Sequence, residues 1–205
     1  EFVLALHAIW DSWATGDQLK FLGEFYTHTL MTPVFSPGPN PHGRPPVYLA
    51  GVGPAMTEAA GEVADGFICH PFTTRQYIQQ VTLPALARGR EKTERELGPL
   101  DIAGMPFTIT GETQEAVDAA ILGTKRQLAF YGSTPAYSPV LEMHGFGALH
   151  EELNVMSKRG EWEAMAHLIP DEPVELVAVI GKPDDIARLM HERYGDLLHR
   201  ISFNT

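Results

Sequence analysis

The residues best suited to ligand chemistry follow a short apolar run near the middle of the chain. Gly51 and Gly53 separate that run from a predicted helix that begins at Pro54. The first amides of a helix have no helical acceptor, and the helix dipole is positive there, so such a turn attracts anions. Pro54 has no N–H, which leaves Gly53, Ala55 and Met56 as donors. The turn therefore predicts a phosphate site, or else a tight turn that simply requires glycine.

This turn matches neither of two common phosphate-binding motifs. The dinucleotide motif G-x-G-x-x-G fits Gly51 and Gly53, but Met56 occupies the position of the last glycine. The Gly-Lys-Ser/Thr of a P-loop is absent as well. The spacing therefore favours an anion without naming the ligand that carries it.

His70 and Cys69 end the next predicted strand, residues 67–70. Barrel enzymes place their site residues at the carboxyl ends of strands, so we predict that His70 lines a pocket. The alternative is a histidine whose hydrogen bonds serve the fold alone. A free cysteine at the end of an apolar strand is typical of a small buried hydrophobe, so no nucleophilic role is predicted for Cys69.

Other aromatic and histidine residues cluster later in the chain. His144 and His150 lie near acidic residues, but their spacing fits no H-E-x-x-H motif, and we predict no metal site. Residues 132–145 read as a long loop punctuated by Pro and Gly. Loops of this length are often functional, so Tyr131, Tyr137 and His144 are candidates to cover a flat, flavin-like ring.

Strands and helices alternate along most of the chain, which indicates parallel strands joined by right-handed crossovers. The predicted strands span residues 47–52, 67–70, 101–110 and 198–204. The predicted helices span residues 54–64, 75–90, 148–160, 161–169 and 183–195. A kink or break is expected at Pro84 in the second of them. A further long helix is expected after an N-cap at Thr113. On this pattern alone, an open doubly wound sheet fits the length better than a closed eight-stranded barrel.

The first part of the chain has a different character. Residues 1–15 predict an amphipathic helix that stops at Gly16, and residues 19–32 predict one extended strand. Residues 33–46 hold six of the 16 prolines and predict a rigid excursion or a linker without helix. The first residues already have a helical pattern, as if the helix continued from an earlier segment, and they lack a basic leader. We therefore expect no signal peptide and a chain that begins within a larger fold.

Composition narrows the function classes further. The 205 residues carry a net charge of −11, which argues against nucleic acid or an anionic membrane surface as the main partner. No uncharged apolar run approaches the roughly 20 residues that span a bilayer. A single cysteine cannot form an internal disulfide, so a cytoplasmic setting is expected.

The stretch from residue 47 to residue 72, with residues 23–41 before it and residues 179–190 after it, resembles the luciferase-like monooxygenase superfamily. Within that superfamily it is most similar to oxidoreductases that use the deazaflavin coenzyme F-420. The resemblance implies an α/β fold in which residues 1–205, a single domain, form about strands five to eight of a (β/α)₈ TIM barrel. The extended Pro-rich segment is then an insertion before the fifth strand.

The resemblance also implies roles for particular residues. Val52, Gly53, Ala55 and Met56 would bind the phosphate-bearing tail of the cofactor. Where related sugar-phosphate dehydrogenases hold a substrate phosphate with a Thr and a Lys, this chain has His70 and Thr73, which points to a less charged substrate. The family's acid/base residues have no counterpart here, and we expect them on strands absent from this chain.

The resulting hypothesis is hydride transfer between coenzyme F-420 and a small organic substrate, by a homodimer. Two alternatives stay open. One is a monooxygenase of the same superfamily that uses flavin mononucleotide (FMN), because both cofactors carry a phosphate. The other is a non-catalytic partial barrel that acts as a binding module.

Overall fold

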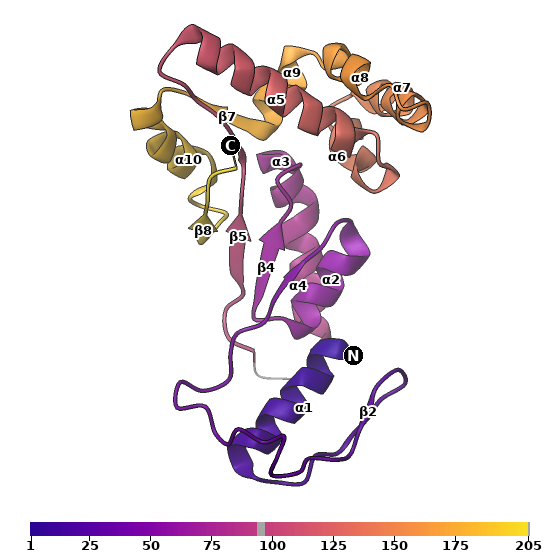
Figure 1. The fold of residues 1–205 in the computed structure, drawn as a ribbon, viewed down its shortest axis with the longest axis vertical. Helices are drawn as coiled ribbons and strands as arrows, with labels where there is room; N and C mark the ends of the chain where they lie inside the picture. The colour runs from indigo at the N-terminus through magenta and orange to yellow at the C-terminus, as the bar shows by residue number, and fades with distance from the viewer. Residues whose placement is uncertain (94–96, 205) are drawn as a thin grey trace.

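The centre of the molecule is a parallel four-stranded sheet with the strand order β3-β4-β5-β8 (Figure 1). A computed structural model describes residues 1–93 and 97–204. The strands are β3 (Tyr48–Ala50), β4 (Gly66–Cys69), β5 (Asp101–Gly104) and β8 (Arg200–Ile201). Phe67 is paired with Leu49 on one side and with Ile102 on the other. The predicted parallel arrangement is therefore confirmed, and each of the four predicted ranges contains one strand of this sheet.

The third predicted strand is divided in two. β5 ends at Gly104, and the chain resumes as β6 (Phe107–Ile109) after Pro106, which cannot donate a ladder hydrogen bond. β6 pairs in parallel with β7 (Ala178–Ile180), a strand that the sequence pattern did not predict. Its three apolar residues follow a short helix directly and are too few to show a period of two.

Two helices pack on each other beside the sheet, α2 (Pro54–Val63) and α4 (Leu83–Lys92). Their contact depends on glycine, since a Cβ at Gly61 would lie 2.3 Å from the Leu86 carbonyl oxygen and one at Gly89 would lie 2.0 Å from that of Glu58. The helix predicted over residues 75–90 is indeed broken. α3 (Arg75–Tyr77) passes into a π-helical turn, η1 (Ile78–Thr82), and α4 then begins with Pro84 in its first turn.

A second group of helices lies beyond the carboxyl ends of β4 and β5 (Figure 1). These helices are α5 (Gln114–Gly132), α6 (Ser138–Glu142), α7 (Gly147–Lys158), α8 (Trp162–Leu168) and α9 (Asp171–Val177). As predicted, the Thr113 hydroxyl caps α5, accepting a hydrogen bond from the Ala116 N–H at 3.2 Å. α10 (Ile186–Tyr194) follows a short 3₁₀ turn, η3 (Pro183–Asp185), and packs near β7.

The prediction of a long irregular loop over residues 132–145 is wrong. A 3₁₀ turn, η2 (Pro135–Tyr137), and helix α6 occupy most of it. Pro135 and Pro139 fall in the first turns of these two elements, where a missing N–H costs no helical hydrogen bond. Prolines that suggested a loop therefore start short helices.

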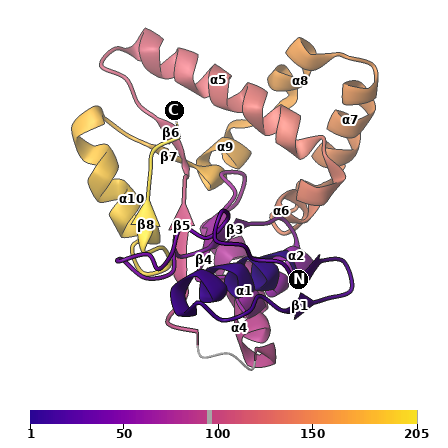
Figure 2. The same cartoon turned by 60° about the horizontal axis from the view of Figure 1, so that its bottom comes forward.

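The N-terminal segment lies near the opposite end of the sheet in Figure 1 and comes to the front in Figure 2. Helix α1 (Phe2–Thr15) ends at Gly16 with a φ of 78°, as predicted. The expected single strand over residues 19–32 is instead an antiparallel hairpin of β1 (Phe21–Leu22) and β2 (Thr27–His28). The carboxylate of Glu1 accepts hydrogen bonds from three amides of the hairpin turn, a distant contact that the local pattern could not reveal.

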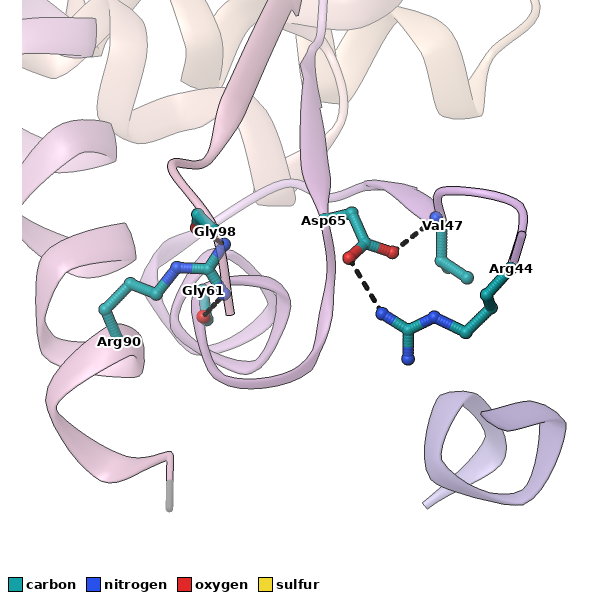
Figure 3. Close-up of polar contacts among 6 residues, drawn as sticks. All are labelled: Arg44, Val47, Gly61, Asp65, Arg90 and Gly98. Atoms are coloured by element: carbon teal, nitrogen blue, oxygen red, sulfur yellow. Dashed lines mark hydrogen bonds and ion pairs between the residues drawn. The ribbon is translucent and has the colours of Figure 1, made fainter. Parts of the chain in front are cut away.

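The Pro-rich segment, residues 33–46, contains no helix or strand and is fastened to the sheet at its far end. The Asp65 carboxylate accepts hydrogen bonds from the Val47 N–H at 2.7 Å and from the Arg44 guanidinium at 3.2 Å (Figure 3). Nearby, the Arg90 guanidinium donates to the carbonyl oxygens of Gly61 and Gly98. These contacts fix where β3 begins and hence where its carboxyl end lies.

Buried side chains form two clusters. One lies among the helices α5 to α9 and includes Phe72, Phe107 and Leu128. The other lies between the sheet and α2, α4 and α10, and it includes Phe67, Ile78 and Tyr194. Among the described residues, no helix combines the length and apolar character needed to cross a bilayer.

Candidate cofactor and substrate site

The turn between β3 and α2 has a backbone that glycine alone adopts easily. Gly53 has φ 80° and ψ 160° and stands at the N-cap of α2. A Cβ built there would meet no atom within 4 Å, so the backbone angle and not crowding requires glycine. At Gly51 crowding favours glycine, because a Cβ there would lie 3.2 Å from the Cβ of Met56. The two glycines thus shape the turn and keep it open on one side.

The first amides of α2 have no partner in the described part of the chain. The first helical bond is donated by the Thr57 N–H to the Gly53 carbonyl at 3.2 Å, and the Thr57 hydroxyl donates to the same oxygen at 2.8 Å. No side chain caps the helix, and no described protein group accepts from the N–H of Gly53, Ala55 or Met56. The predicted donors are therefore free, and their role in cofactor binding stays a prediction.

Charge around this turn is favourable to an anion. The first turn of α2 holds no acidic residue. The nearest carboxylate along the helix, Glu58, is paired with both Arg88 and Lys92. These two cations lower the pKa of Glu58, so it stays ionised and compensated.

Two cavities adjoin the turn and extend to the end of β4. One has a volume of about 250 Å³ and reaches Met105 after β5, and the other is much smaller, about 30 Å³. Gly51, Val52, Cys69 and His70 line both. No Lys, Arg, Asp or Glu is among the described residues that line either cavity. Met105 was not predicted, because the sequence pattern placed it inside one strand over residues 101–110, whereas β5 ends at Gly104.

His70 is held in one orientation and one tautomer. It follows β4 directly and is half-buried, and its Nδ1 accepts a hydrogen bond from the Phe72 N–H at 3.0 Å. Burial lowers the pKa of His70, which favours the neutral imidazole at neutral pH. With Nδ1 occupied as an acceptor, the proton lies on Nε2. The cavity therefore contains a neutral hydrogen-bond donor.

Two tyrosines enclose the imidazole of His70. The ring of Tyr131, from the end of α5, meets it edge-on with 4.6 Å between centroids. The ring of Tyr137, from η2, lies at 4.7 Å. The structure thus brings together two of the three predicted ring-covering residues. The third, His144, is not among the residues that line the two cavities, and its Nε2 lies 2.9 Å from the hydroxyl of Thr74.

Cys69 has the environment of an inert thiol. It is 4% exposed, and burial raises its pKa to about 12. A thiol with that pKa forms almost no thiolate at neutral pH, in agreement with the predicted role as a small hydrophobe. The described residues also contain no cluster of three side chains suited to a metal ion.

A family model described as luciferase-like monooxygenase matches residues 1–200. The chain belongs to this family. The resemblance drawn from residues 47–72 and their flanking segments is thereby confirmed.

Three proteins similar to the chain illustrate the range of its relatives. It is 47% identical over 201 residues to an uncharacterized protein of Mycobacterium tuberculosis, covering 98% of this chain and 59% of that protein. It is 35% identical over 101 residues to the F-420-dependent glucose-6-phosphate dehydrogenase of Gordonia bronchialis, covering 49% of this chain and 28% of the enzyme. The fold is similar to that of the coenzyme F-420-dependent tetrahydromethanopterin reductase from Methanopyrus kandleri, with a TM-score of 0.70, 19% identity, and coverage of 97% and 55%.

The chain spans little more than half the length of these longer relatives, 59% of the mycobacterial protein and 55% of the reductase. Of these relatives, one is named as an F-420-dependent dehydrogenase and one as an F-420-dependent reductase.

Proposed function

We propose that the protein transfers a hydride between coenzyme F-420 and a small organic substrate. The observation that carries this proposal is the set of free amides at Gly53, Ala55 and Met56, which lie at the carboxyl end of a parallel strand beside a cavity. Val52 lines that cavity and completes the group. When bound, the deazaflavin would supply the hydride-transfer chemistry, while the protein supplies binding and orientation.

The residues present fit a phosphate in three respects. The free N–H groups are donors, the helix dipole adds positive potential, and the first turn of α2 has no carboxylate to repel the ligand. The positive φ at residue 53 favours glycine, and because glycine has no side chain, none covers the turn. The binding energy would therefore come from the backbone of this turn.

FMN is the second candidate cofactor. It is supported by the family description, luciferase-like monooxygenase. FMN also ends in a phosphate, so the amides of the turn suit both cofactors equally. The relatives named as F-420-dependent favour the deazaflavin.

We further propose that this chain supplies about strands five to eight of a (β/α)₈ barrel. β3 and β8 lie at the two ends of the strand order, where a barrel would continue with further strands. The acid/base residues are then expected in the part of the relatives that this chain does not cover. A homodimer is the expected assembly, and sedimentation analysis of the full-length protein tests it.

Calorimetric titration of the full-length protein with F-420 and, separately, with FMN tests the proposed function. We expect saturable one-to-one binding of F-420 and weaker binding of FMN. Tighter binding of FMN would favour the monooxygenase alternative. Failure of both cofactors to bind would leave the non-catalytic module as the better account.

A further inference from the structure

The substrate side of the site is built from uncharged groups, and one of them is a fixed hydrogen-bond donor. We propose that His70 determines substrate specificity by donating a hydrogen bond from Nε2 to an uncharged oxygen, a carbonyl or a hydroxyl, of the substrate. This inference rests on the proposed function, because it concerns the molecule that exchanges a hydride with the cofactor. It names the substrate class as neutral ketones, aldehydes or alcohols and excludes phosphorylated or carboxylated compounds.

The first step of the argument is the direction of the donor. The Phe72 N–H occupies Nδ1 of His70 at 3.0 Å, so a neutral ring has a proton only on Nε2. No described protein group accepts a hydrogen bond from Nε2, which leaves this N–H for a ligand or for water. A carbonyl or hydroxyl oxygen is the complementary acceptor.

The second step is the fixed position of the ring. Tyr131 packs edge-on against His70 at 4.6 Å and Tyr137 lies at 4.7 Å, so the imidazole is held between two rings from separate elements. His70 also lines the larger cavity, about 250 Å³, where its neighbours include Ile68 and Met105 and make the wall apolar. A donor held in one place between apolar walls selects ligands by the position of a single oxygen.

The third step is the absence of a compensating cation. Among the described residues lining the two cavities, none is a lysine or an arginine. Arg75 lies five residues after His70, but its guanidinium donates two hydrogen bonds of 2.6 Å to Asp196 and a third to the Arg193 carbonyl. Among the described residues around His70, a phosphate or carboxylate of the substrate would therefore find no cation to pair with, whereas the free amides of the Gly53 turn remain for the phosphate of the cofactor.

Histidine side-chain NMR on the full-length protein tests the proposal without requiring turnover. The probes are cyclohexanone and cyclohexanol, with cyclohexanecarboxylate and cyclohexyl phosphate as anionic counterparts of similar shape. In the His70→Asn variant the amide oxygen can still accept from the Phe72 N–H, but the distal donor is gone. In His70→Gln the longer side chain places an amide N–H near the Nε2 position. The signal missing from the His70→Asn spectrum identifies His70 among the other histidines of the protein.

We expect the Nε2–H tautomer in the wild type, a shift of the His70 signal with the two neutral probes, and much weaker binding of the two anions. His70→Asn should weaken cyclohexanone binding by roughly fivefold to tenfold, the effect of one hydrogen bond, and His70→Gln should restore most of it. A proton on Nδ1, tighter binding of cyclohexyl phosphate, or unchanged cyclohexanone affinity in His70→Asn would overturn the proposal.

Titration of the same three proteins with F-420 separates the two hypotheses. If the wild type binds F-420 but the His70 readouts fail, only the substrate inference is wrong. If the wild type binds neither F-420 nor FMN, the proposed function fails. We expect all three proteins to bind F-420 with similar affinity, because the free amides of the Gly53 turn belong to the backbone and not to His70.

Discussion

The Ala55→Glu substitution should raise the stability of the protein and weaken cofactor binding at the same time. Ala55 is exposed in the first turn of α2, its N–H is free, and no acidic residue competes there. A carboxylate at this position interacts favourably with the helix dipole, by about 0.3–1 kcal/mol in the free energy of unfolding. It would also lie next to any phosphate bound by the same amides.

The size of the repulsion follows from Coulomb's law. Two unit charges about 6 Å apart repel by roughly 0.7 kcal/mol at the dielectric constant of water and by roughly 3 kcal/mol at an effective value of about 20. The site is partly open, so we expect an intermediate value of about 1–2 kcal/mol. Since about 1.4 kcal/mol corresponds to a tenfold change, the F-420 dissociation constant should rise by roughly fivefold to 30-fold.

Ala55→Gln is the matched control, because it has nearly the same shape and no charge. Calorimetry with F-420 and thermal unfolding should be measured for both variants and the wild type. Added salt should reduce the difference between Glu and Gln, since it screens exposed charges. If both variants bind F-420 as tightly as the wild type while Glu shows the expected gain in stability, no anion binds at this turn. If both variants lose the same affinity relative to the wild type, the cause is steric and not the charge.

Three further results are expected. Gly89→Ala should lower the free energy of unfolding, measured in urea, by about 1–3 kcal/mol, because its Cβ would overlap the Glu58 carbonyl. The control, Gly123→Ala, lies in a helix with open space around it and should raise the free energy of unfolding by up to about 1 kcal/mol. Cys69 should resist alkylation by iodoacetamide in the folded protein and react fully in denaturant, as mass spectrometry would show, and rapid native labelling would contradict its burial. Burial lowers the pKa of His70 below its ordinary value of 6.5, so the unfolded chain binds a proton first as the pH falls. The free energy of unfolding should therefore decline below about pH 6.5, and it should decline less steeply in His70→Asn.

The parts of the fold that sequence predicted well are those with local causes. Two of the four predicted strands, residues 47–52 and 67–70, stood out because each is a short apolar run typical of a buried parallel strand. The start of α2 followed from Pro54, and the end of α1 followed from Gly16. The break before Pro84 followed from the missing N–H of proline. In each case the deciding interaction lies within a few residues in the chain.

The parts that sequence missed depend on distant partners. The hairpin of β1 and β2 is held by the carboxylate of Glu1, more than 20 residues before its turn. Strand β7 exists because β6 provides a partner about 70 residues earlier, and three residues alone show no strand pattern. His70 was predicted as a pocket residue, but its enclosure by Tyr131 and Tyr137 depends on where α5 ends.

The two halves of the candidate site differ in what holds their ligand. The half that would bind the anion consists of the backbone amides of Gly53, Ala55 and Met56, which a change of side chain does not remove. The sequence is therefore constrained mainly at Gly53, whose positive φ favours glycine. The substrate half consists of side chains, His70 and Tyr137, each of which one mutation can replace. We therefore expect family members with different substrates to bind the cofactor through the same turn and to differ at the position of His70. Replacing His70 in this chain should accordingly change which small molecules bind and leave the affinity for F-420 nearly unaltered.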